Sequence, residues 1–364
     1  MTKRVFIIAG EASGDMLGAG LVRALKKLAP GTIFFGVGGE EMLSAGVKSL
    51  FPLSDIAVMG LTEVLGHLPL IKRRMSETIT AAKAFAPDVI ITIDAPGFTG
   101  RTAKALKGVA PLVHYVAPSV WAYRPGRAQK LAEVYDLLLC FFEFEKPYFT
   151  RHGLRTIVVG HPASENIKMR KPRTQHGKNL VFLPGSRPGM AKRLLPIYKK
   201  VAEKLDAQIT IPVVETNNAL VRKATCSWPN KVKIISSREA RYKAFTQADA
   251  AVSISGTGVL ELALMGVPTV AIYKSSFITG VIARLMLTIR SVTLPNIILK
   301  RVMVKEFLQG AATAENIFAE VQRLTSDKTV RAKYARDAAD LRRALARHKN
   351  PTLAAARAVA EMLK

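Results

Sequence analysis

The stretch VFIIAGEASGD, residues 5–15, decides the fold class of this 364-residue chain. Its first five residues form a short apolar run of the kind that buried strands show, and small residues follow at once. Residues 13–29 then carry a helical pattern, which Pro30 and Gly31 stop. A strand, a tight turn and a helix in this order are typical of a doubly wound parallel sheet.

The same alternation continues along the chain and restarts once. A first series of apolar runs predicts strands, the polar and basic residues 164–178 predict a linker, and a second series follows. We therefore predict an α/β fold with two Rossmann-like, doubly wound parallel-sheet domains that face a cleft. The domains are expected over 1–165 and 166–340, with a C-terminal helix over 341–364 whose packing on the first domain is left open. The predicted strands are 5–9, 33–37, 89–93, 112–116, 137–141 and 156–159, then 180–183, 208–213, 232–235, 250–254 and 269–272.

Charge is the unusual feature of the composition. Lys and Arg number 54 against 27 Asp and Glu, so the net charge of +27 predicts an anionic partner: a nucleic acid, a phosphorylated substrate or an acidic membrane face. Hydrophobic residues make up 49%, which excludes wholesale disorder. The two cysteines match no zinc spacing and indicate a reducing compartment. We expect no signal peptide, because Glu11 ends the first apolar run early, and no membrane-spanning helix, because no run of about 18 uncharged apolar residues occurs.

Three turns of small residues follow predicted strands, and each places backbone N–H groups where a helix begins, which suits a phosphate. Neither a P-loop nor the GxGxxG fingerprint occurs. Arg187 would neutralise a phosphate through a forked contact, and Glu261 would accept from ribose hydroxyls. The alternatives are ordinary structural features: a helix cap by Ser13, a surface arginine and an imperfectly spaced capping box. The candidate residues are Glu11, Ser13, Gly14 and Asp15 in the first turn, Gly185, Ser186 and Arg187 in the second, and Ser255, Gly256, Thr257 and Glu261 in the third.

Asp94 is the first candidate for a general base. It directly follows the strand 89–93, so its carboxylate is expected at the edge of the sheet where ligands bind. Its alternative is a structural turn aspartate. Glu11 and Asp15 are rival bases, and so are His114 and His161, although a lone histidine near a strand end is more often structural.

Two segments combine apolar with basic residues. Residues 262–305 contain no acid, and LGHLPLIKRR at 65–74 has the same character. Both suit an anionic membrane surface, and the alternative is a buried helix with basic edges. Residues 114–127 join aromatic rings and arginines, which suits a sugar platform, a nucleic-acid surface or a core strand with a tryptophan anchor.

Together these motifs resemble one family, the lipid-A-disaccharide synthases. The resemblance implies a GT-B fold and adds Asn296, Glu306 and Gln309 to the donor site, which also includes Ser13 and Gly14. The chain departs from the family pattern at Gly97 and Thr99, where an acid and an asparagine are usual, so a diverged paralogue stays open. The likeness runs over roughly residues 3–320 and includes, in order, GEASGD at 10–15, AVMG at 57–60, IDAP at 93–96, YVAPSVW at 115–121, VGHP at 159–162, LPGSR at 183–187, SGT at 255–257, LPN at 294–296 and KEFLQ at 305–309.

The resemblance also implies a reaction. An inverting glycosyltransferase would join UDP-2,3-diacylglucosamine to the 6-hydroxyl of 2,3-diacylglucosamine 1-phosphate (lipid X), giving a β-1,6-linked disaccharide 1-phosphate and UDP. One general base is needed, and neither a cofactor nor a metal ion is expected. UDP would bind the second domain and the acceptor the first, on the cytoplasmic face of the anionic inner membrane. A homodimer is left open. The alternatives are another GT-B transferase of a UDP-sugar and a basic nucleic-acid-binding protein; we expect no nucleic-acid partner.

Overall fold

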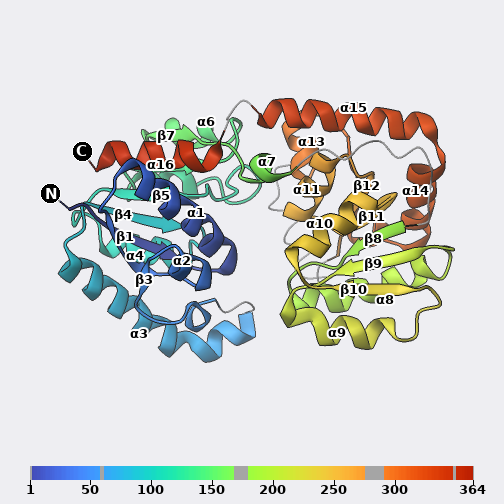
Figure 1. Ribbon diagram of the computed structural model, residues 1–364, viewed down its shortest axis with the longest axis horizontal. Coiled ribbons are helices and arrows are strands. Elements are labelled where there is room, and N and C mark those ends of the chain that lie inside the picture. The colour runs from blue at the N-terminus through green and yellow to red at the C-terminus, as the bar shows by residue number, and fades with distance from the viewer. Residues whose placement is uncertain (1, 58–60, 168–178, 275–290, 347–349, 364) are drawn as a thin grey trace. The chain divides into compact units, whose positions relative to one another are not determined.

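The computed structural model describes residues 2–57, 61–167, 179–274, 291–346 and 350–363 (Figure 1). The chain divides into two units, the first comprising Met1–Glu165 and Arg347–Lys364 and the second Asn166–Ala346. Each unit is built on one sheet, and the strand pairs of the described residues are all parallel. The predicted α/β class with two parallel-sheet domains is confirmed.

The sheet of the first unit has the strand order β3-β2-β1-β4-β5-β6-β7. Successive side chains of a strand point to opposite faces, so Val5 and Ile7 join a core with α1 and α16, whereas Phe6 and Ile8 join a core with α3 and α4. Its strands are β1 (Arg4–Ala9), β2 (Ile33–Val37), β3 (Lys48–Ser49), β4 (Val89–Ile93), β5 (Leu112–Tyr115), β6 (Leu137–Cys140) and β7 (Thr156–Val158). Its helices are α1 (Ala12–Leu28), α2 (Glu40–Ser44), η1 (Leu53–Asp55), α3 (Leu61–Phe85), α4 (Thr99–Ala105), α5 (Arg127–Ala132), α6 (Lys146–Thr150) and α16 (Pro351–Met362), with α7 (Ala163–Asn166) at the boundary.

The sheet of the second unit has the order β10-β9-β8-β11-β12-β13. The edge strand β13 was not predicted, because its residues are charged or only half-buried and form no apolar run. The strands are β8 (Asn179–Leu183), β9 (Gln208–Pro212), β10 (Val232–Ile235), β11 (Ala250–Ile254), β12 (Thr269–Tyr273) and β13 (Lys305–Leu308). The helices are α8 (Pro188–Ala202), α9 (Glu215–Thr225), α10 (Arg238–Gln247), α11 (Thr257–Met265), α13 (Leu294–Leu299), η2 (Gln309–Ala311), α14 (Ala314–Ser326) and α15 (Lys328–Leu345).

The C-terminal residues are shared between the units, and the expected single helix over 341–364 is two helices. Arg342 of α15 donates hydrogen bonds to the carbonyl oxygens of Ile167 and Leu264, which keeps the chain in the second unit as far as residue 346. The next helix, α16, lies against α1 in the first unit (Figure 1). Small residues permit this close approach, since a Cβ on Gly20 would lie 3.3 Å from Thr352.

In each sheet the strands are parallel, so their carboxyl ends lie at the same edge, where ligands bind in such folds. In the first unit β1 and β4 are neighbours, so the turns that follow them, with Glu11 and Asp94, adjoin. In the second unit β8 and β11 are neighbours, which brings together the turns of Arg187 and Ser255. The candidate residues are thus gathered into two sites, one in each unit.

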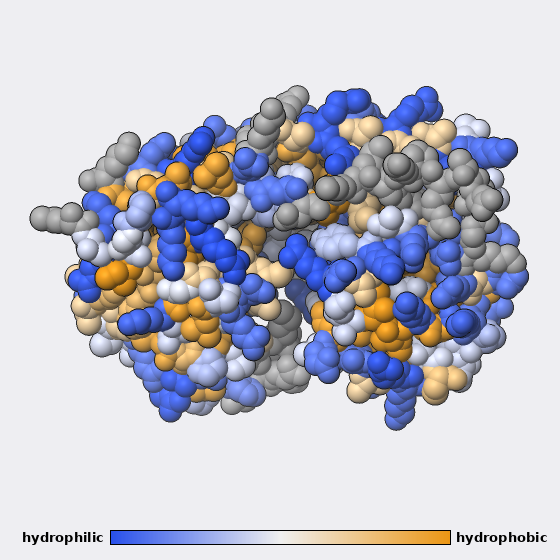
Figure 2. Space-filling model, viewed as in Figure 1, coloured by the Kyte–Doolittle hydropathy of each residue, from blue (hydrophilic) through white to orange (hydrophobic). Residues whose placement is uncertain are grey.

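The surface gives two further facts. On the face drawn in Figure 2, hydrophilic residues are spread over both units and do not form one arm or stripe.

Among the helices of the described residues, none has the length and apolar character needed to cross a bilayer.

Candidate active site

The turn after β4 is strained, and its neighbours hold it. Asp94 and Ala95 have φ of 48° and 45°, in the left-handed region that residues other than glycine rarely adopt. The hydroxyl of Thr99 donates to both of their carbonyl oxygens, at 2.6 and 3.0 Å. Gly10 makes room, because a Cβ there would lie 2.2 Å from the Cβ of Ala95. The fold therefore sustains a conformation that costs free energy, as functional sites often do.

The next strand end is strained as well. Val116, a β-branched residue directly after β5, has φ of 83°. Its N–H donates to Leu139 at 3.0 Å, and the N–H of Asp94 donates to Tyr115 at 3.0 Å. At both strand ends the hydrogen bonds of the sheet continue for one more residue, and the backbone then turns sharply. Both turns therefore place side chains at the same edge of the sheet.

Asp94 and Glu11 form a carboxyl pair at this edge. Burial and the negative charge of Glu11 raise the pKa of Asp94 to about 6, and a hydrogen bond between the two carboxyl groups acts in the same direction. The N–H of Ala95 donates to Asp94 Oδ1 at 2.8 Å and opposes this rise. Ser13 donates to Glu11 Oε1 at 2.5 Å. Asp94 is therefore a stronger base than an exposed aspartate, yet it is largely ionised at neutral pH.

A cavity of about 300 Å³ lies beside Asp94, lined also by Pro96, His114, residues 116–120, Tyr123 and Arg127. His114 is not a charged base there: burial lowers its pKa to about 4, and its Nδ1 lies 2.8 Å from the hydroxyl of Thr92. The imidazole thus forms a fixed, neutral wall of the cavity, in line with the structural alternative.

Asp15, the third acid considered for the base, is engaged elsewhere. Its buried carboxylate accepts hydrogen bonds from the N–H groups of Gly39, Glu41 and Met42 at 2.8, 3.0 and 3.0 Å. These are the free amides at the start of α2, so the structure assigns Asp15 to holding that helix. The proposed helix cap by Ser13 is also absent, since Glu11 occupies the N-cap position of α1 without a side-chain cap.

Two other first-unit candidates are structural. Gly14 is buried, and a Cβ there would lie 3.4 Å from the carbonyl oxygen of Ile93, so it allows α1 to approach β4. His161 accepts from the N–H of Ala163 at 3.1 Å and stacks on Phe142, and burial lowers its pKa to about 4. Neither offers a charge or a proton acceptor to a ligand.

The turn between β8 and α8 leaves an arginine exposed. Gly185 has φ of 91°, and its carbonyl oxygen accepts from Asn217 Nδ2 at 2.8 Å, which fixes the turn. Ser186 and Arg187 follow on the surface, with Arg187 at the N-cap position of α8. No residue in the part of the chain that the structure describes forms a hydrogen bond or ion pair with the Arg187 guanidinium. It is available to an anion.

The turn between β11 and α11 offers backbone amides more than hydroxyls. Ser255 is already engaged, since its N–H donates to Ile272 and its hydroxyl to Val292, both at 2.9 Å. Gly256 and Thr257 are exposed, and no side chain caps the start of α11. The predicted role of Ser255 as a hydroxyl donor thus competes with an internal bond, whereas the first amides of α11 suit a phosphate.

Glu261 is held in place on α11. Arg241 forms an ion pair with it, and the hydroxyl of Tyr242 donates to Oε1 at 3.1 Å. Its side chain is 17% exposed, so these partners do not enclose it completely. A capping box is excluded, because Glu261 accepts from α10 and not from the turn. Arg241 was missed by the sequence analysis, since it lies on another helix and belongs to no motif.

Asn296 and Glu306 are joined in one partly buried network. Asn296 Nδ2 donates to Glu306 Oε1 at 3.0 Å. Glu306 Oε1 also accepts from the N–H and hydroxyl of Thr293, at 3.0 and 2.6 Å, and from Ser291. The N–H of Val292 donates to the same carboxylate, and its carbonyl oxygen accepts from the Ser255 hydroxyl. The network thereby supports the turn between β11 and α11. Both residues shape the site through this support and present no free group to a ligand.

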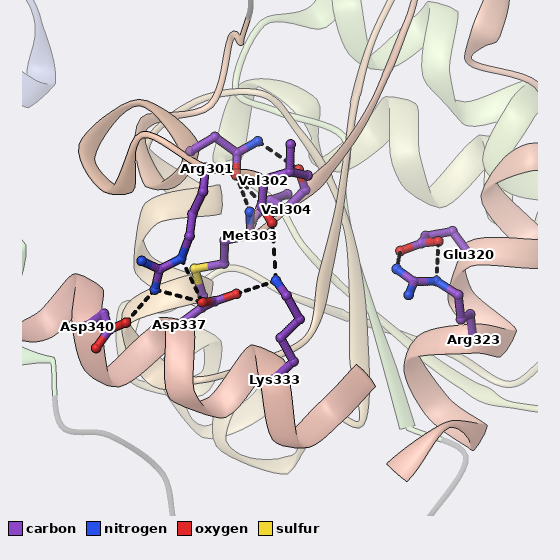
Figure 3. A network of polar contacts seen from close by, with 10 residues as sticks. Arg301, Val302, Met303, Val304, Glu320, Arg323, Lys333, Asp337 and Asp340 are labelled. Carbon is purple, nitrogen blue, oxygen red and sulfur yellow. Dashed lines mark hydrogen bonds and ion pairs between the residues drawn. The ribbon is translucent and has the colours of Figure 1, made fainter. Parts of the chain in front are cut away.

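The segment after α13 is fixed by a second set of contacts. Asn296 Oδ1 accepts from the N–H groups of Met303 and Val304, at 2.9 and 2.8 Å. Arg301 reaches Asp337 and Asp340 of α15, and Lys333 reaches Asp337 at 2.9 Å (Figure 3). Gln309 follows β13 with φ of 51°, at the start of η2. Of the donor-site residues implied by the family resemblance, Asn296 and Glu306 are therefore held in place by several hydrogen bonds.

The segments predicted to face a membrane are only partly described. Residues 275–290, within the acid-free stretch, lie outside the described residues, as do the side chains of 61–66. In the rest of 65–74, Lys72 and Arg73 are exposed, but Arg73 pairs with Glu77 at 3.5 Å, and Arg74 pairs with Asp55 and Glu77, at 2.6 Å each. In this part, fewer basic side chains are available to contact a lipid surface than the sequence indicates.

Metal ligands were not expected, and within the described ranges no group of three or more His, Cys, Asp or Glu side chains is placed to hold a metal ion. A reaction without metal stays a prediction.

Solved structures of low identity are similar to this chain over nearly its whole length. The calicheamicin glycosyltransferase CalG4 is 16% identical with a TM-score of 0.63, and covers 100% of this chain and 98% of its own. MurG from Acinetobacter baumannii is 17% identical with a TM-score of 0.61, and 99% of each chain is covered. At such identity the likeness shows the fold, which is that of the GT-B glycosyltransferases.

Sequence relatives are much closer. Lipid-A-disaccharide synthase from Ruegeria pomeroyi is 40% identical over 348 residues, covering 89% of this chain and 87% of the relative. The synthase from Paramagnetospirillum magneticum is 40% identical over 361 residues, with 94% and 92% covered. A family model described as lipid-A-disaccharide synthetase matches residues 5–360. The chain therefore belongs to the lipid-A-disaccharide synthase family of GT-B glycosyltransferases.

Proposed function

We propose that this protein joins UDP-2,3-diacylglucosamine to lipid X, forming the β-1,6-linked disaccharide 1-phosphate and UDP by inversion. The observation that carries the proposal is the pair of Asp94 and Glu11 beside a cavity at the edge of the first sheet. Inversion in one displacement needs one base and no covalent intermediate, and this pair supplies it without a metal ion or cofactor.

Asp94 acts as the base. The 6-hydroxyl of the acceptor has a pKa far above neutrality, so its proton leaves only as the oxygen bonds to the anomeric carbon and the bond to UDP breaks. Glu11 is a positioning residue: its charge raises the pKa of Asp94, and Ser13 holds its orientation. A base of higher pKa accepts the proton more readily in the transition state.

The second unit binds UDP in this proposal. The Arg187 guanidinium and the first amides of α11 neutralise the diphosphate, which carries extra charge as it leaves. Ser186, Gly185, Ser255 and Gly256 shape these turns, and Glu261 faces the ribose hydroxyls. Asn296, Glu306 and Gln309 support these turns. In the first unit, Ser13 orients Glu11, and Gly14 lets α1 approach β4.

The protein works as a peripheral enzyme on the cytoplasmic face of the inner membrane. Exposed Lys72 supports this, because each basic side chain near an acidic lipid surface contributes about 1 kcal/mol. Co-sedimentation with anionic vesicles, weakened by salt and absent with neutral vesicles, is the expected result. Equal binding to both kinds of vesicle contradicts it.

The deciding experiment is incubation of the purified protein with UDP-2,3-diacylglucosamine and lipid X, followed by mass analysis of the lipids. The disaccharide 1-phosphate should form with one UDP per product, and Asp94→Asn should not form it at a comparable rate. A panel with UDP-N-acetylglucosamine as the competing donor tests the diverged paralogue. That alternative has one supporting observation, since exposed Gly97 leaves the turn beside Asp94 without its usual acid. Use of that donor alone would overturn the proposal.

A further inference from the structure

The cavity beside Asp94 is lined by one negatively charged and one positively charged side chain. Its charged lining residues are Asp94 and Arg127, and His114 next to them is neutral. A ligand that fits both must therefore bring a proton donor to one end and an anion to the other. At about 300 Å³ the cavity is near the lower limit for ligand sites, which suits a single sugar ring with one substituent.

Two arginines share one aromatic ring at the basic end. The guanidinium carbons of Arg124 and Arg127 lie 5.0 and 5.7 Å from the centre of the Tyr123 ring. Such stacking orients a guanidinium while leaving its N–H groups free. Within the described residues, neither guanidinium makes a hydrogen bond or an ion pair with a carboxylate.

A chain with twice as many basic as acidic residues is expected to contain arginines without an acidic partner. The position of Arg127 at the cavity is therefore the informative observation. Several arginines of the same unit do find acids: Arg74 pairs with Asp55 and Glu77, and Arg155 with Glu361. Arg127 is half-buried at the cavity wall and still lacks one. The backbone also turns there against its preference, since Arg124 has φ of 53°. A conformation of this kind persists where the surroundings hold it, often at ligand sites.

We propose that Arg127, with Arg124 and Tyr123, forms a subsite for a sugar phosphate monoester whose free hydroxyl reaches Asp94. A forked guanidinium matches the oxygens of a phosphate, and a second one beside it neutralises the remaining charge. Resting on the proposed function, this assigns the 1-phosphate of the acceptor to Arg127 and its 6-hydroxyl to Asp94. The subsite then explains how an acceptor is chosen over its dephosphorylated form and in which direction it binds.

The test compares acceptors with and without the phosphate in the full-length protein. Wild type, Arg127→Gln and Arg124→Gln are assayed with lipid X and with 2,3-diacylglucosamine at a saturating donor concentration. Arg127→Gln should lower kcat/KM for lipid X roughly 10- to 100-fold, the loss expected for charge-assisted hydrogen bonds, and should change the value for the dephosphorylated acceptor little. Arg124→Gln should act in the same direction but less strongly.

Arg151→Gln is the matched control. Arg151 stacks on Tyr148, with 5.4 Å from its guanidinium carbon to the ring centre, but it is exposed and does not line the cavity. This variant should behave as wild type with both acceptors. An equal loss with both acceptors in Arg127→Gln, or a wild type indifferent to the phosphate, would overturn the proposal.

A binding arm separates this inference from the proposed function. Wild type and Arg127→Gln are titrated with glucosamine 1-phosphate and with glucosamine, and binding is measured by calorimetry or NMR. This measurement needs no turnover. If no disaccharide forms, the proposed function fails, whereas preferential binding of glucosamine 1-phosphate to wild type alone still supports the subsite. Equal binding of that probe to wild type and Arg127→Gln rejects it.

Discussion

The turn after β4 and the turns after β8 and β11 occupy equivalent places at the edges of two parallel sheets, yet they are built differently. The first contains two residues with positive φ, a half-buried carboxyl pair and a threonine that holds the backbone. The other two are exposed, with an arginine that lacks a partner among the described residues and a helix start without a side-chain cap. One region is prepared for proton transfer, which depends on a tuned pKa, and the other for an anion, which backbone amides bind wherever a helix begins.

Asp94→Asn tests the first region and should have the largest effect. The substitution keeps the shape and the acceptor atom for the N–H of Ala95 but removes the proton acceptor, so turnover should fall by about 10²–10⁴-fold. UDP affinity, measured by calorimetry, should stay near that of wild type. Asp88→Asn is the control, because Asp88 lies at the opposite end of the same strand, where it accepts from the N–H of Arg4 at 2.7 Å. Collapse of UDP binding in Asp94→Asn would make Asp94 structural.

Arg187→Ala tests the second region. If its guanidinium meets the leaving diphosphate, transition-state stabilisation should fall by about 2–4 kcal/mol, read from kcat/KM. Thermal stability should not change, since the side chain is exposed. Arg193→Ala, exposed on the same helix, provides the matched control. Wild-type activity in Arg187→Ala would remove it from the donor site.

Asp15→Ala separates the fold of the first turn from its chemistry. Its loss leaves three amides at the start of α2 without their acceptor, so the free energy of unfolding should drop by about 1–3 kcal/mol in urea. The activity of the folded fraction should remain near wild type. A catalytic defect at full stability would instead return Asp15 to the list of candidate bases.

Glu11→Gln should have the smallest effect and a distinct signature. The pKa of Asp94 is raised to about 6, so kcat/KM should rise as the pH increases through about 6 and the base loses its proton. Without the charge of Glu11 the pKa of Asp94 falls, and this acidic limb should move down by up to about one pH unit. A pH profile identical to that of wild type would show that Glu11 does not act through Asp94.

The sequence predicted the strands, the turns and the residues within them better than it predicted their uses. Asp94 and Glu11 lie 83 positions apart, and the motif GEASGD gives no sign that Glu11 faces Asp94 while Asp15 faces α2. Glu11 is the N-cap residue of α1 and Asp15 lies in its first turn, and either use is compatible with an acid at both positions. Arg241, which holds Glu261, belongs to no motif at all.

Apolar runs by themselves determined two parallel-sheet domains, because strands buried on both faces read as short continuous apolar runs that alternate with helical patterns, a local and repeated signal. The order of small residues at the strand ends determined where ligands are expected. Only the tertiary structure decided that Glu11 raises the pKa of Asp94, that Thr99 and Gly10 hold a strained turn, and that residues up to 346 stay with the second unit. The physical reason is range: strand formation follows from neighbours in sequence, whereas a pKa, a strained φ and a helix's packing partner depend on groups brought together by folding.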